Sequence, residues 1–166
     1  MIGINRNEFN KIFDDWYIHI RNFIYYKTGD IEKAEDITQD TFLKLWEIRQ
    51  QIDQKTIKSL LYTMANNMYL NDVAHGKVVL KFESDYSMNP YTSSPEYEME
   101  VKEFDNRLQS ALNKMDEKNR TVYLMSRIDD LTYQEIAQRL GLTVKAIEKR
   151  ISKAKAFLKE ELSVDI

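Results

Sequence analysis

Cysteine is absent from the 166 residues of the chain, and glycine and proline are rare, with four and two copies. The lack of cysteine excludes disulfide bonds, zinc–cysteine sites and thiol nucleophiles, and it suits a reducing compartment. The shortage of glycine and proline argues against a strand-and-turn architecture, whereas the abundance of leucine, isoleucine, lysine, glutamate and methionine favours helices. We therefore expect an all-α fold.

Membrane-spanning and catalytic patterns are also missing. No apolar run in the sequence is long enough to cross a bilayer, and the first ten residues lack the apolar core of a signal peptide, so we expect a cytoplasmic protein. There is no glycine-rich phosphate loop and no HExxH pattern, and the only histidines are His19 and His75. An enzyme is therefore the weakest interpretation, and we expect no metal site and no cofactor.

The net charge of −3 conceals an uneven distribution. Residues 1–104 carry 12 basic and 17 acidic side chains, whereas residues 105–166 carry 12 basic and 10 acidic ones. Within the second part, residues 143–159 hold six basic residues and a single acid, Glu148. Positive charge concentrated on one helix is typical of a nucleic-acid-binding surface.

Apolar residues recur at helical spacing in three early segments, at about 7–27, 31–49 and 56–73. We expect Asn7 to cap the first helix, Gly29 to end it and Asp30 to cap the second. Three such helices form one small core. The residues that we expect inside it are Phe9, Ile12, Phe13, Trp16, Ile20, Phe23, Ile24, Ala34, Ile37, Thr41, Leu45, Ile48, Ile57, Leu60, Leu61, Met64, Ala65 and Met68.

The stretch 83–98 contains both prolines, five serines or threonines and no periodic apolar pattern, which predicts a flexible linker. It divides the chain into two small helical domains, residues 1–82 and 99–166. Further helices are expected at about 95–115 and 116–128. The first of these is expected to bury Val101, Phe104, Leu108, Ala111, Leu112 and Met115.

The next segment, LTYQEIAQRLGLTVKAIEKRISKAKAFLKEEL, has the pattern of a helix-turn-helix. Thr132 and Glu135 form a capping box that starts one helix. Gly141 suits the left-handed conformation that ends this helix, and Thr143 caps the next helix after a turn of about three residues. This short spacing predicts a C-terminal helix-turn-helix domain.

The last helix presents two different faces. Its apolar face consists of Ile147, Ile151, Ala154 and Leu158, and the opposite face is basic. A solvated lysine-rich face is the alternative, but the neighbouring capping box and tight turn favour a helix that enters the major groove of DNA. Our candidates for base-edge contacts are Glu148, Lys149, Ser152 and Lys153, and those for phosphate contacts are Lys145, Arg150 and Lys155.

The second helix also has a distinct outward face. Leu43 falls on the face that holds Asp36, Gln39, Asp40 and Glu47, away from the apolar stripe. One exposed leucine is ordinary. A leucine set among carboxylates, however, also suits docking of a basic, partly apolar partner.

Together these motifs resemble an extracytoplasmic-function sigma factor of the bacterial sigma-70 class, over about residues 9–162. The segment DIEKAEDITQDTFLKLWE is similar to the family's polymerase-binding segment in region 2, and the helix-turn-helix is similar to region 4, which reads the minus-thirty-five element. The resemblance identifies the partner of the Leu43 face as the clamp helices of RNA polymerase. The residues that it assigns to polymerase binding are Asp36, Gln39, Asp40, Leu43 and Glu47.

The resemblance also implies that the helix IKSLLYTMANNMYLND and its preceding loop melt and capture the minus-ten element. Asn67 matches the family's recurrent asparagine, and Thr63 and Asn71 share its face. Tyr62 suits either stacking on a base or packing. Our candidates for minus-ten contacts are Lys55, Lys58, Tyr62, Thr63, Asn67 and Asn71, with Gln50, Gln51, Asp53 and Gln54 in the loop.

The function implied by the resemblance is that of an RNA polymerase sigma factor, which directs promoter-specific initiation and is not itself an enzyme. Its implied partners are core RNA polymerase, promoter DNA and, as for many relatives, a membrane-bound anti-sigma factor. Family members commonly keep their two domains closed until polymerase separates them. The alternatives are a helix-turn-helix regulator that is not a polymerase subunit, and a purely helical interaction protein without affinity for DNA.

Overall fold

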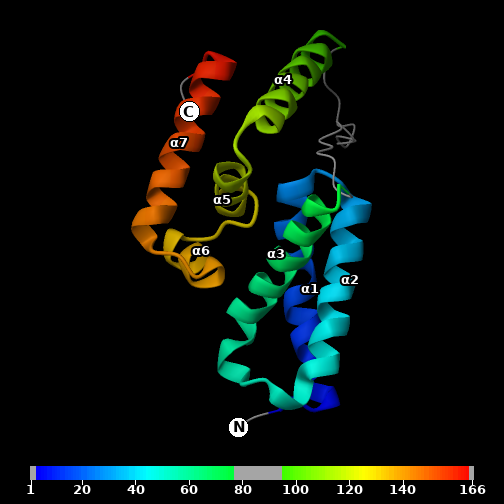
Figure 1. Cartoon of the computed structure of the whole chain (residues 1–166). Helices are drawn as coiled ribbons and strands as arrows, with labels where there is room; N and C mark the ends of the chain where they lie inside the picture. Colours follow the sequence, from blue (N-terminus) through cyan, green and yellow to red (C-terminus); the bar gives the residue numbers. More distant parts are fainter. Residues whose placement is uncertain (1–2, 77–94, 165–166) are drawn as a thin grey trace.

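The computed structural model describes residues 3–76 and 95–164, and this part of the chain is all-α, as expected (Figure 1). None of its helices is long and apolar enough to cross a membrane. Two 3-10 turns, Arg49–Gln51 and Gln54–Thr56, connect the second helix to the third. The α-helices are α1 (Arg6–Thr28), α2 (Ile31–Ile48), α3 (Ile57–Ala74), α4 (Pro95–Lys114), α5 (Glu117–Arg127), α6 (Tyr133–Leu140) and α7 (Val144–Leu162).

The start of α1 differs from the expectation. Asn5, not Asn7, is the N-cap, and its side chain accepts a hydrogen bond from the backbone N–H of Glu8. The Glu8 carboxylate accepts in return from the backbone N–H of Asn5, at 2.8 Å. Asn5 is preferred because a glutamate follows three residues later and completes the capping box, whereas Asn10 stands at that position relative to Asn7.

The other expected helix ends are confirmed. Gly29, with φ 68°, ends α1, and the side chain of Asp30 caps α2 by accepting from the backbone N–H of Lys33. The same logic operates in the C-terminal motif. A capping box at Thr132 starts α6, and Gly141, which is left-handed with φ 64°, ends it. The side chain of Thr143 caps α7.

Helices α1, α2 and α3 pack together through the expected stripes, with one exception. Ala34 and Leu45 of α2 and Leu61 of α3 are fully buried between the helices. Phe13, which we expected in the core, is 39% exposed and lies at its edge against the rings of Tyr17 and Phe42. The expectation was wrong because the stripe of α1 is wider than the surface that α2 and α3 cover.

Helices α4 to α7 form a second group in which α7 contacts the other three. All four apolar residues of its predicted stripe are buried. Phe104 of α4, in contrast, is 43% exposed where burial was expected. Helix α4 packs mainly along α7 and extends away from the remaining helices, so its Phe104 face lacks a cover in the described part of the chain (Figure 1). Val101 lies outside the residues whose side chains are described.

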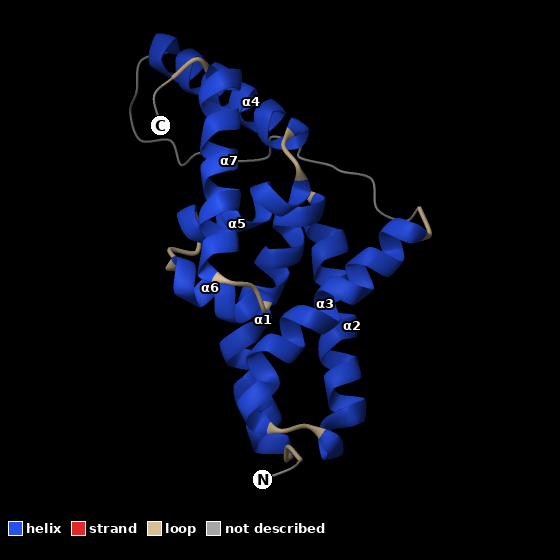
Figure 2. Cartoon of the chain, turned by 60° about the vertical axis from the view of Figure 1, so that its left-hand side comes forward, coloured by secondary structure: helices blue, strands red, loops and turns tan. Residues whose placement is uncertain are grey.

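We call α1–α3 the N-terminal half and α4–α7 the C-terminal half. Residues 95–98, assigned both to the end of the linker and to the start of the next helix, form the first turn of α4, and residues 83–94 lie outside the described part. The domain boundaries at 82 and 99 therefore stay predictions. The two halves touch, since α5 packs against α1 and α6 packs against α3 (Figure 2).

Candidate functional site

One candidate surface is the outward face of α2, which we call the acidic surface: Asp36, Gln39, Asp40, Leu43 and Glu47. All five side chains are exposed, and Leu43 is 59% exposed. The face is fixed by the stripe on the opposite side of the helix, which is buried against α1 and α3. An apolar side chain is thereby held among carboxylates on a rigid helix.

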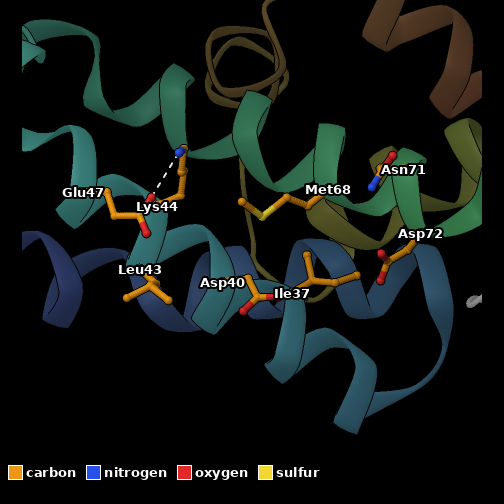
Figure 3. Close-up of a pocket in the computed structure, with 8 residues that line it drawn as sticks. All are labelled: Ile37, Asp40, Leu43, Lys44, Glu47, Met68, Asn71 and Asp72. Carbon is orange, nitrogen blue, oxygen red and sulfur yellow. Dashed lines mark hydrogen bonds and ion pairs between the residues drawn. The ribbon is translucent and has the colours of Figure 1, made fainter.

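A groove of about 310 Å³ adjoins the acidic surface between α2 and α3 (Figure 3). Ile37 and Met68 supply its apolar lining, while Asp40, Glu47 and Asp72 add carboxylates. Two of these carboxylates are already paired within the protein. The Nζ of Lys44 lies 3.0 Å from Glu47, and the Nζ of Lys33 lies 3.0 Å from Asp72.

Sequence reasoning missed the contribution of α3 to this groove. Met68 was expected to face inward and is half-buried, with its sulfur accepting a hydrogen bond from the Thr41 hydroxyl at 3.4 Å. Asp72 carried no signal of its own, because only the packing of α3 on α2 brings it beside Asp40. The acidic surface therefore continues into a groove that α3 helps to form.

The second candidate surface is the outward face of α7, which we call the basic surface: Lys145, Glu148, Lys149, Ser152 and Lys153. All five side chains are exposed. Its three lysines form no ion pair with any residue in 3–76 or 95–164. The phosphate-contact candidates Arg150 and Lys155 are half-buried, at the edges of this surface.

The candidates for minus-ten contacts do not gather in one place. Lys55, Lys58, Thr63, Asn67 and Asn71 are exposed, as a DNA-contacting role requires. Asn71, however, lines the groove beside the acidic surface, whereas Thr63 lines a cavity between the two halves. Asn67 lies on α3 between these two places.

Tyr62 is not available for stacking in this structure. Its side chain is 2% exposed, its ring packs edge-on against Phe23, and its hydroxyl accepts a hydrogen bond from Nη1 of Arg139 at 3.1 Å. Burial raises the pKa of Tyr62, and the nearby Arg139 guanidinium opposes that shift. Of the two roles that the sequence leaves open, packing is the one observed, because α6 covers the ring.

The interface between the two halves is centred on Arg120 of α5, which is 1% exposed. Its Nε and Nη2 donate to the carbonyl oxygens of Tyr26 and Lys27 at the end of α1, at 2.8 and 2.9 Å. Its Nη1 donates to the carbonyl oxygens of Leu112 and Met115, at 3.1 and 3.0 Å. One cation thus satisfies the electronegative ends of two helices, one from each half.

Other polar contacts surround Arg120. Lys27, 7% exposed, pairs with Glu117, and burial lowers the pKa of Lys27 although this carboxylate opposes the shift. Asp129 accepts hydrogen bonds from the Tyr26 hydroxyl at 2.7 Å and from the Asn22 amide at 3.3 Å. The sequence offered no signal for this interface, because none of these residues forms a local motif.

Comparisons with known proteins agree with the two-part organisation. Residues 12–77 match the family described as Sigma-70 region 2, and residues 105–158 match the family described as Sigma-70, region 4. The chain is 23% identical to the RNA polymerase sigma factor YlaC of Bacillus subtilis over 164 residues, 96% of this chain and 94% of that protein. It is 24% identical to the ECF RNA polymerase sigma factor SigW of the same organism, covering 95% of this chain and 90% of that protein.

Two solved structures share the fold. One is CnrH in complex with the cytosolic domain of CnrY, with a TM-score of 0.63 and 22% identity over 98% of this chain and 92% of that one. The other is the sigma factor RpoE in complex with the anti-sigma factor NepR from Bartonella quintana, with a TM-score of 0.65 and 22% identity over 95% of this chain and 98% of that one. The fold described above is therefore one that sigma factors adopt.

Proposed function

The chain belongs to the sigma-70 family and is an RNA polymerase sigma factor of the extracytoplasmic-function group, and from this premise we propose how its surfaces divide the work. The matches to region 2 and region 4 cover both halves. A helix-turn-helix regulator that is not a polymerase subunit is therefore not favoured, because it would leave the region 2 match unexplained.

The acidic surface and its groove are the proposed binding site for core RNA polymerase. The observation that carries this proposal is Leu43, 59% exposed on a helix whose opposite face is buried and whose neighbours are carboxylates. An apolar anchor inside a charged rim is the usual composition of an energetic centre in a protein interface. The complementary partner is a basic, partly apolar helix pair, which fits the clamp helices of the polymerase.

The basic surface is the proposed reader of the minus-thirty-five element. Helix α7 is held by α6 at the geometry of a helix-turn-helix, and its unpaired lysines face outward. Such a helix can place Lys149, Ser152 and Lys153 against base edges in the major groove. The exposed polar residues of α3 remain our proposal for minus-ten contacts. Tyr62 joins them only if the two halves separate.

We further propose that the interface between the halves is the closed form of the free factor, which polymerase opens. The chain would then act in the cytoplasm as a non-catalytic subunit. The related structures of CnrH and RpoE contain CnrY and the anti-sigma factor NepR. An anti-sigma factor, membrane-bound in our expectation, is accordingly the third proposed partner.

Transcription in vitro with purified core polymerase tests the proposal directly. The chain should bind the core stoichiometrically and produce promoter-specific transcripts that the core alone does not make. Leu43→Glu should reduce transcription by weakening core binding, whereas Lys149→Ala with Lys153→Ala should retain core binding and weaken promoter recognition. Failure to bind core polymerase under any salt condition would contradict the assignment of the acidic surface.

A further inference from the structure

A cavity of about 450 Å³ lies between the two halves. Helices α1 and α3 supply one wall, and α5, α6 and α7 supply the other. This volume falls within the range of protein sites that bind small organic ligands. The cavity is distinct from the acidic and the basic surfaces, although Thr63 and Arg150, which are candidates for DNA contacts, line it.

The lining is strongly cationic. Lys27, Lys118, Arg139 and Arg150 face a single carboxylate among the described lining residues, that of Glu117. Glu117 is already paired with Lys27, so the surplus is three positive charges in a chain whose net charge is −3. Positive charges that share a partly enclosed space repel one another and attract a counter-ion.

Two of these cations are unpaired. Lys118 and Arg150 make no hydrogen bond and no ion pair with any residue in the described ranges. Arg139 is partly engaged, since it donates to Tyr62 and lies 5.1 Å from the Trp16 ring. Burial is the main cause of the lowered pKa of Lys27, Glu117 opposes the shift, and the nearby Arg150 adds a smaller lowering.

The uncharged residues of the lining indicate which other groups the ligand carries. Thr63 and Asn66 of α3 place a hydroxyl and an amide on the wall across from Lys118 and Arg150, whereas Leu70, Leu140 and Leu142 supply accessible apolar lining. Phosphate is the anion that best matches an arginine and a lysine with polar donors across the cavity. We propose that this cavity binds a phosphorylated small molecule of nucleotide size, bridging Lys118 and Arg150 on one wall and Thr63 and Asn66 on the other.

A ligand bound in this way contacts both halves at once. It therefore binds the closed arrangement and not the separated one, and it raises the stability of the closed form with increasing concentration. The consequence is a sigma factor whose opening depends on a soluble phosphorylated metabolite. Both the binding and its consequence rest on the closed form proposed above, because the cavity exists only where the two halves meet.

Calorimetric titration of the full chain tests the binding, with inorganic pyrophosphate, ADP and a short 5′-phosphorylated single strand of DNA as separate probes at physiological salt. ADP should bind with one-to-one stoichiometry and raise the melting temperature, and pyrophosphate should bind more weakly because it lacks the ring. Lys118→Gln and Arg150→Gln should each weaken ADP binding about tenfold. Circular dichroism spectra should confirm that both variants are folded.

Lys102→Gln is the matched control, because Lys102 is an exposed lysine of α4 outside the cavity lining. It should leave ADP binding unchanged. Equal weakening by Lys102→Gln would overturn the proposal, since the attraction would then be general. So would the absence of binding by both ADP and pyrophosphate at millimolar concentration, or binding only of the 5′-phosphorylated single strand of DNA. Neither polymerase nor promoter is present, so a failure here is separate from a failure of the proposed function.

Discussion

Helices α2 and α7 have similar buried faces but exposed faces of opposite charge. Each buries most or all of an apolar stripe, and each exposes the face opposite that stripe. Helix α2 carries five acidic and two basic residues, whereas α7 carries six basic and three acidic ones. In both helices the inward stripe provides the packing that the fold requires. The outward face is not constrained by packing and can therefore determine the partner.

The two faces also differ in apolar content. The acidic surface holds Leu43 and continues into a groove with Ile37 and Met68, whereas the basic surface consists of charged and polar side chains alone. Protein interfaces need an apolar anchor, and a polyanion needs neutralised phosphates. The difference fits the proposed division of one small chain into a protein-binding face and a DNA-binding face.

Arg120→Met should have the largest effect, because it weakens the interface between the two halves that carry the acidic and the basic surface. The substitution removes the donors to four buried carbonyl oxygens. We expect a loss of about 3 kcal/mol in the free energy of unfolding, measured by urea denaturation. Arg120→Lys should lie between, because an ammonium group cannot reproduce the planar fork. Arg127→Met on the exposed side of α5 should cost little, and an equal loss there would contradict the role of Arg120.

Leu43→Glu should impair binding at the acidic surface and leave the basic surface unchanged. The change adds charge at the apolar anchor of the proposed interface, so affinity for core polymerase should fall roughly 30-fold, as measured by fluorescence anisotropy. Ile18→Glu is the matched control, because Ile18 is 49% exposed on α1 and lies outside the acidic surface and both cavities. If both variants bind alike, Leu43 is not the anchor.

Lys149→Ala combined with Lys153→Ala should break the basic surface alone. We expect promoter affinity of the holoenzyme to fall about tenfold while core binding is unchanged, because each lysine loses one contact to DNA. Where a lysine contacts phosphate, the slope of log affinity against log salt should also decrease by about 0.9. Promoter affinity can be measured by filter binding over a salt series. Lys102→Ala, off this surface, should alter neither quantity.

The smallest expected effect concerns His19, at the interface between the halves. Burial lowers its pKa from 6.5, Arg139 lowers it further, and Asp129 opposes the shift. Because the folded state disfavours the protonated form, stability is complete above the unfolded pKa and declines as the pH falls through 6.5. The melting temperature should therefore decrease more between pH 7.5 and 5.5 for the native chain than for His19→Gln. Parallel decreases would show that His19 does not contribute.

Local signals predicted most of the fold. Capping residues and left-handed glycines act within one turn of the backbone, so Asp30, Thr132 and Gly141 could be placed from the sequence. The same holds for exposed faces that lie opposite a strong apolar stripe, as for Leu43. In both cases the determining interactions lie within a few residues along the chain.

The rest depends on contacts between distant helices. In the sequence, Tyr62 suits a stacking role and a packing role equally well. The choice between them depends on Arg139, which is 77 positions away and covers Tyr62 in the fold. Phe104 fits a helical stripe, yet burial requires a partner helix that periodicity cannot supply. Nothing in the sequence distinguishes Arg120 from other arginines in helices. Its partners are backbone carbonyl oxygens, which every residue type has, so they leave no pattern in the sequence.

The position of Arg120 has a consequence for biosynthesis. The carbonyl oxygens of Tyr26 and Lys27 are made 94 and 93 residues before the guanidinium that they accept from. While the chain leaves the ribosome, the end of α1 is therefore hydrated and α1–α3 can form without their later cover. The halves can join only after α5 has been made, and an RNA polymerase encountered earlier would meet a region 2 that is still open.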